Sequence, residues 1–324
     1  MNRLLPAGAV AIFSLILCAC TVTPKVQPAE ATTCNVEFVV LGIGQDGGSP
    51  QINHSDDPGW ADPSLRLWAA SGALIDHRHS RRYLFEATPD IREQLHFLDS
   101  ISSGGNQPLG LAGVFLTHAH IGHYTGLMFA GHESAGASDL PVFALRRMHD
   151  FLQSNGPWDQ LVRYENIKLT RITNKTALTL GNQLSVTPLE VPHRDEYSET
   201  AAFVIQGPSK SVLFLPDIDD WDRWEREYGT KIEDLIAQVD FALLDATFFD
   251  NDELPGRDMS LIPHPRVADS IKRFSALPGS EQQKIQFFHI NHTNRLRFAK
   301  SAESQFVAKR GFKVARRGDR LCLD

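Results

Sequence analysis

The sequence predicts an α/β layered domain, and three observations lead to this prediction. Short apolar runs recur between residues 36 and 288, and they are typical of buried strands. Stretches with apolar residues at helical spacing lie between these runs. A Gly-Pro-Ser-Lys turn at residues 207–210 joins two of the runs and indicates a hairpin. Strands mixed with helices and hairpins are typical of one layered domain.

The expected elements follow from apolar runs, helix starts and glycine stops. Residues 36–42 are apolar throughout, which predicts a strand buried on both faces. Pro89 indicates the start of a helix, and Gly311 indicates the end of one. The expected strands are residues 36–42, 83–86, 111–116, 184–191, 201–205, 211–215, 241–244 and 285–288. The expected helices are residues 89–98, 221–239 with an interruption near Gly229, 266–277 and 298–310.

The composition of the 324 residues is that of a globular protein. Hydrophobic residues make up 42% and charged residues 22%, which excludes a disordered chain, a collagen and a coiled coil. The formal net charge is −7 and basic residues form no cluster, which argues against nucleic acid as a partner. We expect a small-molecule substrate instead. The sequence gives no prediction of the oligomeric state.

Residues 1–19 have the layout of an export signal, with one arginine, an apolar run and then small residues. The apolar run is shorter than the roughly 20 residues of a membrane span. Leu17-Cys18-Ala19-Cys20 resembles the bacterial lipobox, in which the last cysteine carries lipid. A secretory signal cleaved nearby is the alternative. We expect residues 20–33 to tether a domain of residues 34–324 to a bacterial membrane, facing the periplasm, through this lipid alone.

Cys34 and Cys322 lie in the first and the last expected strand of the domain. Disulfides persist in the compartment outside the inner membrane. We hypothesise that the two cysteines are bonded and join the two ends of the domain. Two unpaired buried thiols are the alternative, because pairing cannot be deduced from sequence.

Histidine, aspartate or asparagine follows five of the expected strands. In α/β sheets, ligands bind in the crevice beyond the carboxyl ends of strands. The sequence therefore predicts a site at this edge. The residues are His118, His120 and His123 after the strand 111–116, His193 after 184–191, Asp217 after 211–215, Asp245 after 241–244, and His289, Asn291 and His292 after 285–288.

The spacing of the first three histidines indicates a metal site. His118 and His120 leave a strand two residues apart, and His123 follows three residues later. An isolated histidine is usually an ordinary core or surface residue, but three within six positions favour metal. Imidazole nitrogens suit one or two Zn²⁺ ions, and they accept iron or manganese as well.

This pattern resembles the metallo-β-lactamase fold superfamily in the order and spacing of its ligands. The resemblance implies a four-layered αββα sandwich with a one- or two-metal site at one edge. It also implies a role for each matching residue. His118, His120 and His193 match the first metal site, His123 and His292 match the second, and Asp217 matches the bridging carboxylate.

A closer resemblance, over nearly the whole domain, is to the pyrroloquinoline-quinone biosynthesis protein B branch. The matching segments are residues 45–51 (QDGGSPQ), 87–95 (ATPDIREQL), 244–248 (LDATF) with Asp252 and Glu253, and 289–294 (HINHTN). Members of that branch often lack the first two motif histidines and have asparagine in place of His292. The fuller set in this chain favours hydrolysis over the branch's role in oxidising a peptide tyrosine.

Gly122 departs from the superfamily, in which an aspartate precedes the last histidine of the motif. Its absence removes a ligand of the second metal. One metal at the three-histidine site, two metals with another carboxylate recruited, and a site of different chemistry all remain open. Asp46 is our candidate replacement, and a turn-forming aspartate is the alternative. If this account is right, Gly122→Asp should raise the amount of bound metal.

Further residues are expected to support the site. His264 is a candidate substrate contact or extra ligand, and a surface histidine at a helix start is the alternative. Asp245 and Asn291 are expected to orient ligands through hydrogen bonds. His289 is expected to lie behind the ligands, because alternation along a strand would direct it away from His292.

The favoured hypothesis is an exported hydrolase that uses a metal-bound hydroxide. The hydroxide would attack an ester, lactone, amide or phosphodiester, with catalytic help from Asp217, His264 and Asp46. One alternative is an iron-dependent oxygenase or oxidoreductase related to the protein B branch. Another, suggested by Gly122, is a binding protein with a vestigial site.

Overall fold

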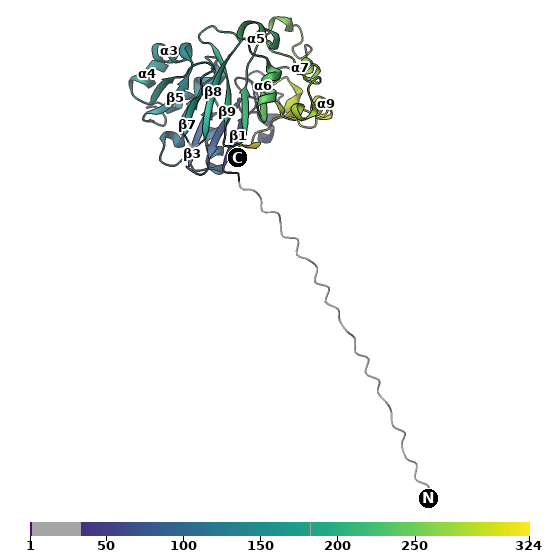
Figure 1. Cartoon of the computed structure of the whole chain (residues 1–324), viewed down its shortest axis with the longest axis horizontal. Helices are drawn as coiled ribbons and strands as arrows, with labels where there is room; N and C mark the ends of the chain where they lie inside the picture. Colours follow the sequence, from purple (N-terminus) through teal and green to yellow (C-terminus); the bar gives the residue numbers. More distant parts are fainter. Residues whose placement is uncertain (2–33, 182) are drawn as a thin grey trace. The chain divides into compact units, whose positions relative to one another are not determined.

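The computed structural model describes Met1, residues 34–181 and residues 183–324. The chain divides into two units, Met1–Thr33 and Cys34–Asp324, and the fold below is that of the second unit (Figure 1). The expected signal, the lipobox with Cys20 and the tether lie outside the described residues. Within the described residues, no helix has the length and apolar character needed to cross a membrane.

Two seven-stranded sheets form the centre of the domain. The first has the order β14-β1-β2-β3-β4-β5-β6, and the second has the order β13-β12-β11-β10-β9-β8-β7. The strands of the first sheet are β1 (Val36–Gly42), β2 (Ser71–Asp76), β3 (Arg81–Phe85), β4 (Gly113–Phe115), β5 (Leu140–Ala144), β6 (Ile167–Arg171) and β14 (Arg320–Cys322). Those of the second are β7 (Leu178–Gly181), β8 (Leu184–Val191), β9 (Thr200–Gln206), β10 (Ser211–Leu215), β11 (Phe241–Asp245), β12 (Ile285–Phe288) and β13 (Lys313–Val314).

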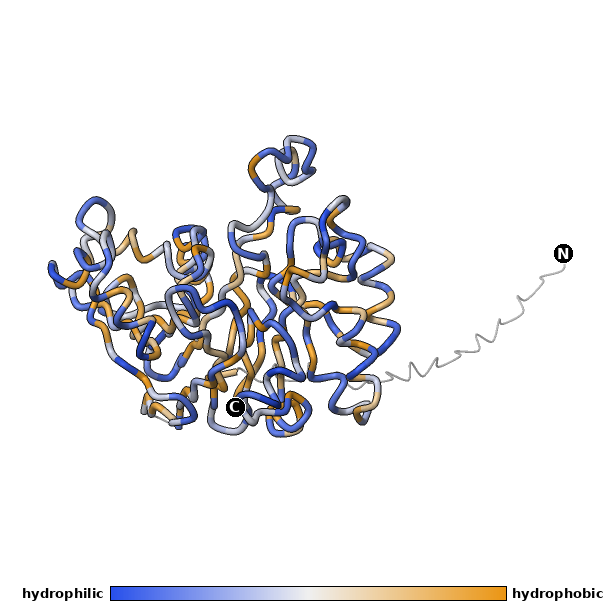
Figure 2. The backbone as a smooth tube through the Cα atoms, turned by 90° about the horizontal axis from the view of Figure 1, so that it is seen from above, coloured by the Kyte–Doolittle hydropathy of each residue, from blue (hydrophilic) through white to orange (hydrophobic). Residues whose placement is uncertain are grey.

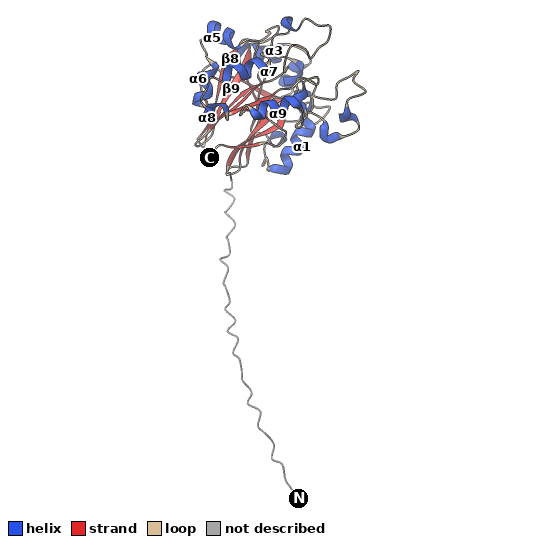
Figure 3. Cartoon of the chain, turned by 90° about the vertical axis from the view of Figure 1, so that its right-hand side faces the viewer, coloured by secondary structure: helices blue, strands red, loops and turns tan. Residues whose placement is uncertain are grey.

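Helices cover the outer face of each sheet (Figures 1 and 3). The first sheet carries α1 (Ile91–Ile101), α2 (Ile121–Tyr124), α3 (Arg146–Ser154) and α4 (Trp158–Arg163). The second packs against α5 (Trp221–Tyr228), α6 (Ile232–Gln238), α7 (Val267–Phe274) and α9 (Ala302–Lys309), and the short α8 (Gly279–Gln282) precedes β12. Short 3-10 helices are Pro58–Trp60, Pro63–Leu65, Pro108–Gly110, Thr125–Ala130, Met259–Leu261 and Arg295–Arg297.

The core forms two clusters. One fills the space between the sheets and continues beneath α5, α6, α7 and α9, and the other lies beneath α1 to α4. Along β1, Phe38 packs between the sheets, whereas its neighbour Val39 packs toward the helices. Both faces of this strand are buried, as its continuous apolar run predicts. Figure 2 shows the hydrophobic strands at the centre of the domain. The αββα sandwich predicted from the sequence is confirmed.

Most of the expected elements are present, and a glycine ends α5 as the sequence predicts. Gly229 has a φ of 63° and ends α5, which divides the expected long helix in two. The turn at residues 207–210 joins the antiparallel strands β9 and β10. The sequence did not predict β2, β5, β6, β7 or β13. At most one face of β5, β6 and β7 is well buried and their apolar runs are short, whereas β2 (SGALID) is buried throughout but has only three consecutive apolar residues.

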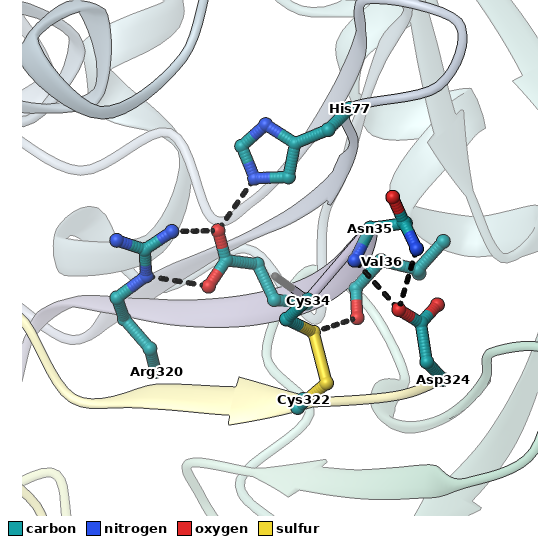
Figure 4. The surroundings of a disulfide bond; sticks show 8 residues. Cys34, Asn35, Val36, His77, Arg320, Cys322 and Asp324 are labelled. Carbon is teal, nitrogen blue, oxygen red and sulfur yellow. Dashed lines mark hydrogen bonds and ion pairs between the residues drawn. A yellow bond between two sulfur atoms is a disulfide. The ribbon is translucent and has the colours of Figure 1, made fainter. Parts of the chain in front are cut away.

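A disulfide joins Cys34 to Cys322, whose Cα atoms are 5.7 Å apart (Figure 4). It links the start of β1 to β14, the last strand, which pairs antiparallel with β1. Next to it, the buried Glu37 accepts hydrogen bonds from Arg320 and contacts His77. The two ends of the domain are therefore held together both by a covalent bond and by an ion pair.

The strand directions bring the ends of several strands to one edge. In the first sheet β1, β3 and β4 run in the same direction, and in the second β8, β10, β11 and β12 do. A parallel bridge between Gly44 and Ile290 connects the segments that follow β1 and β12, so the two sheets meet there. Carboxyl ends of strands from both sheets therefore share this edge.

Candidate metal centre

Three histidines from two strand ends form the first group of possible ligands. His118 and His120 follow β4, and His193 follows β8. His120 Nδ1 lies 2.8 Å from His118 Nε2 and 3.2 Å from His193 Nε2. Two nitrogens on one tetrahedral Zn²⁺ are about 3.3 Å apart, because each Zn–N bond is about 2.0–2.1 Å. The spacing therefore suits one ion held by all three rings.

A second group stands beside the first and contains Asp46, His123 and His289. His123 Nε2 lies 3.6 Å from Asp46 Oδ1. The Oδ2 atom of Asp217 lies 3.1 Å from His123 Nε2 and 3.4 Å from His289 Nε2. Segments that follow β1, β4, β10 and β12 thus bring these four side chains together.

Asp217 lies between the two groups. Its Oδ1 atom is 3.6 Å from His193 Nε2, and its Oδ2 atom is 3.9 Å from His118 Nε2 as well as close to His123. The carboxylate is almost fully buried. It can therefore contribute one oxygen to each of two neighbouring cations.

Buried atoms without partners show that the donor set fits a cation. Among the described residues, His123 Nε2, His289 Nε2 and Asp217 Oδ2 are buried and make no hydrogen bond. A buried polar group left in this state costs about 1–3 kcal/mol, and more when it is charged. Neutral imidazole and carboxylate are ligands for divalent ions. These residues fit a divalent metal ion.

The electrostatics of the cluster point the same way. Burial lowers the pKa of His118 and of His289, so these rings keep the neutral form that binds metal. Burial would raise the pKa of Asp217, but the surrounding histidines outweigh it and hold that pKa well below its usual range. Burial would likewise lower the pKa of His123, whereas the neighbouring carboxylates raise it well above normal. The cluster therefore favours positive charge at its centre.

Each histidine of the two groups has a polar neighbour at its other ring nitrogen. Four of the five make a hydrogen bond there, whereas His123 Nδ1, within the described residues, has only the longer contact with Glu86. Such contacts fix the ring orientation and increase the basicity of the ligating nitrogen. The contacts are Thr117 Oγ1 to His118 Nδ1 (2.8 Å), Glu196 Oε2 to His120 Nε2 (3.0 Å), Asp219 Oδ1 to His193 Nδ1 (2.9 Å), Thr247 Oγ1 to His289 Nδ1 (3.0 Å) and Glu86 Oε2 to His123 Nδ1 (3.7 Å).

Glu86, Asp219 and Glu196 were missed by the sequence analysis. Glu86 is fully buried directly after β3, and burial raises its pKa. The rule that polar residues after strands line the site would have found it. Asp219 follows Asp217 by two residues and gives no signal of its own. Glu196 lies in a loop, and only the folded chain brings it to His120.

Three residues of the site have left-handed backbone conformations. The φ angles are 45° at Asp46, 74° at Glu86 and 59° at His289. Residues other than glycine rarely adopt this region, and doing so costs of the order of 1–3 kcal/mol. Each of these residues turns the chain just after a strand, which directs its side chain toward the cluster.

The prediction for His289 and His292 is corrected by the structure. His289 lies in the second group, whereas His292 lies outside both and its Nε2 atom is 3.1 Å from His54 Nε2. The alternation rule failed because β12 ends at Phe288 and the chain turns at His289 with a positive φ.

Gly122 and Asp46 lie against each other. A Cβ atom at Gly122 would lie 2.3 Å from the Cα atom of Asp46, a distance that real structures do not allow. The structure thus places the Asp46 carboxylate in the second group, where residue 122 would otherwise provide one. We therefore no longer expect Gly122→Asp to raise metal binding, because a side chain there would displace Asp46.

His264, Asp245 and Asn291 occupy the surroundings of the two groups. His264 Nδ1 lies 2.7 Å from Asp245 Oδ2 and 4.0 Å from Asp217 Oδ1, so His264 borders the cluster. His264 is buried, which corrects the alternative of a surface histidine. Asn291 donates a hydrogen bond to Gln45 Oε1 at 2.7 Å, which ties the loop that carries Asp46 to the segment after β12.

Two clefts adjoin the cluster. One of about 520 Å³ includes His193 in its lining, together with residues of β8 and the start of α3. The other, of about 670 Å³, includes His264 together with residues of α5 and α7. A small molecule therefore has room on either side of the histidines.

The sequence profile of the "Beta-lactamase superfamily domain" family matches residues 81–290, which contain all three motif histidines, His193, Asp217 and His289. The chain belongs to the metallo-β-lactamase superfamily. Within the superfamily it resembles the coenzyme PQQ synthesis protein B branch. The protein of that name from Ruegeria pomeroyi is 26% identical over 307 residues, which cover 89% of this chain and 100% of the relative.

Solved structures share the fold of this superfamily member. Zn²⁺-bound PqqB from Methylobacterium extorquens is 22% identical, with a TM-score of 0.70, and the match covers 88% of this chain and 99% of that one. A diphosphatase of the PhnP family is 20% identical, with a TM-score of 0.60, and the match covers 89% of this chain and 98% of that one. At these identities the likeness establishes the fold.

Proposed function

We propose that this protein is a metal-dependent hydrolase of esters, lactones, amides or phosphodiesters. The observation that carries the proposal is the pair of adjoining ligand groups with Asp217 between them. In hydrolases with two metals, the ions lie about 3.5–4 Å apart and share ligands. His118, His120 and His193 would hold one ion, and Asp46, His123 and His289 the other, with Zn²⁺ as the favoured metal.

When bound, the metal supplies a water molecule of lowered pKa and polarises the substrate oxygen. The chain provides the rest. Asp217 contacts both groups and orients what binds between them. Asp245 accepts a hydrogen bond from His264 Nδ1. Burial would lower the pKa of His264, but Asp245 outweighs it and raises that pKa, so the protonated ring can donate from Nε2 to the leaving group. His264 and Asp217 are thus the proposed catalytic side chains.

One second function has specific support. The curated relatives include coenzyme PQQ synthesis protein B from several bacteria, and the match extends over most of each chain. An iron-dependent oxygenase or oxidoreductase is the corresponding candidate, because imidazole and carboxylate bind iron as well as zinc. The three-histidine group favours the hydrolase, since three histidines form a known catalytic Zn²⁺ site that keeps one position open for an activated water molecule.

We also propose that the protein is exported and anchored by lipid at Cys20. The lipobox-like sequence and the disulfide between Cys34 and Cys322 support this location, because disulfides persist outside the cytoplasm. Cys20→Ser should move the protein from the membrane fraction to the soluble periplasmic fraction. Retention of the variant in the membrane fraction would argue against the anchor.

The proposed function is tested by metal analysis and turnover of the mature protein. We expect about two zinc ions per chain and hydrolysis of at least one chromogenic ester, lactone or phosphodiester. His118→Ala should lower the metal content, and it should lower kcat/KM at least about 100-fold. His264→Ala should lower kcat and keep the metal. His96→Ala, which changes an exposed histidine of α1, is the control. Bound iron with a visible absorption band and no hydrolysis would favour the oxidoreductase.

A further inference from the structure

Exposed apolar side chains gather on the segments that carry the site residues. Single exposed apolar residues are normal on protein surfaces, but several around a site mark the binding of an apolar partner. Within residues 34–181 and 183–324, two exposed ones, Tyr164 and Phe306, lie on other segments. Those on the site segments are Ile52 and Trp60 in the loop that follows Asp46, Ile121 and Met128 after His120, Tyr197 after His193, and Leu261 before His264.

Three of these residues lie within four positions of a site histidine in the sequence, and we call them the apolar rim: Ile121, Tyr197 and Leu261. Ile121 follows the ligand His120 and is 70% exposed. Leu261, 78% exposed, ends the 3-10 turn three residues before His264. The neighbouring site residues are less exposed, because His264 is buried and His120 is half-buried.

The position of Tyr197 is fixed by its two neighbours in the chain. Glu196 Oε2 lies 3.0 Å from His120 Nε2, and Ser198 Oγ accepts a hydrogen bond of 2.8 Å from Ala119 N. The loop is therefore held on the turn that carries His118 and His120. Tyr197 is 63% exposed, and its ring lies 5.3 Å from that of Phe151.

Three arginines on the segments that carry the site residues are paired with carboxylates. Arg147 pairs with Asp195 at 3.1 Å, Arg194 with Glu196 at 3.7 Å and Arg223 with Asp219 at 2.7 Å. A substrate with several negative charges needs unpaired cations near its binding site. These three arginines therefore do not supply the unpaired charge that such a substrate would need beside the exposed apolar residues.

We propose that the substrate carries an apolar acyl chain or aromatic group that lies against Ile121, Tyr197 and Leu261. The inference rests on the proposed function and specifies its substrate class, an ester or lactone with an apolar acyl part. Metal held by the two ligand groups would bind the reacting carbonyl of the substrate, and the apolar rim would contact the rest of the substrate. Each buried CH₂ group then adds to binding.

Binding of two hydroxamates tests this inference without turnover. A hydroxamate binds metal, and octanohydroxamate adds an apolar chain that acetohydroxamate lacks. We expect the zinc-loaded protein to bind octanohydroxamate at least about tenfold more tightly by calorimetry. The triple variant Ile121→Ser/Tyr197→Ser/Leu261→Ser should lose this ratio while its Kd for acetohydroxamate stays within about twofold.

The control is Phe306→Ser, which removes an exposed apolar side chain of α9 and should preserve the ratio. Equal affinities of the wild type for both hydroxamates, binding of neither, or an unchanged ratio in the triple variant would overturn the inference. Failure of the proposed function has a different signature. It would appear as absent turnover of octanoyl and acetyl esters while the chain-length ratio in binding persists.

Discussion

At the scale of single residues, the exchange between Gly122 and Asp46 decides how the second ligand group is built. The chain gives up a side chain at residue 122, and a carboxylate from the loop after β1 occupies the space. The close approach of the two backbones requires glycine at 122. The carboxylate thus comes from a different part of the sequence and reaches the same cluster.

Asp46→Asn should cost the protein its second metal ion. The neutral amide is a weaker ligand, and we expect affinity at this group to fall about 10–100-fold while the three-histidine group keeps its ion. Gly122→Asp and Gly122→Ala should both have the same effect, because either Cβ atom displaces Asp46. Elemental analysis after dialysis measures zinc per chain. An unchanged stoichiometry in all three variants would contradict this assignment.

At the scale of elements, the loops that follow strands hold the site together, and buried groups outside it stabilise them. Asp57 and Arg297 form a buried bidentate ion pair of 2.6 and 3.0 Å between the loop after β1 and the segment after β12. Arg297 lowers the pKa of Asp57 to about 2. The loop that carries Asp46 is thereby fixed to the segment that carries His289.

Glu253, in the loop after β11, should make stability depend on pH. Burial raises its pKa from 4.5 to about 7, and it accepts hydrogen bonds from Phe249 N and Thr293 Oγ1. The folded protein binds this proton more tightly than the unfolded chain. The free energy of unfolding should therefore fall by up to about 3 kcal/mol as pH rises from about 4.5 to about 7.

Urea denaturation at pH 5 and pH 8 measures this dependence. Glu253→Gln keeps the side-chain size and removes the titration, so its free energy of unfolding should fall less between the two pH values. Asp252→Asn, an exposed neighbour, serves as the control. Equal pH dependence in the wild type and Glu253→Gln would show that Glu253 is ionised throughout.

At the scale of the whole molecule, the disulfide between Cys34 and Cys322 joins residues 288 positions apart. A bond that closes so long a loop restricts the unfolded chain strongly. The Cys34→Ser/Cys322→Ser variant should lose about 2–5 kcal/mol of unfolding free energy in urea. A reductant should destabilise the wild type similarly and leave the variant unchanged. Two free thiols in the denatured, unreduced mature protein would contradict the bond.

Features that depend on residues close together in the sequence could be predicted, whereas the direction of a side chain beyond a strand end could not. Local apolar runs predicted the strands with two buried faces, such as β1, β10 and β12, to the residue. The motif of His118, His120 and His123 and the strand-end positions of His193 and Asp217 located the cluster. The roles of His289 and His292 could not be read, because a single backbone angle at His289 reverses the direction of its side chain.

The sequence by itself determined the α/β layered domain, the edge at which the site lies and most of its nitrogen ligands, because these follow from local periodicity and spacing. The four-layered sandwich was implied by the resemblance of the histidine motif to the metallo-β-lactamase superfamily. Only the tertiary structure decided that Asp46 replaces a carboxylate at Gly122, that Glu86 and Asp219 contact the ligand histidines from behind, and that Glu196 reaches His120. Those contacts join residues from 26 to 76 positions apart, and no local sequence pattern indicates which distant segments come together.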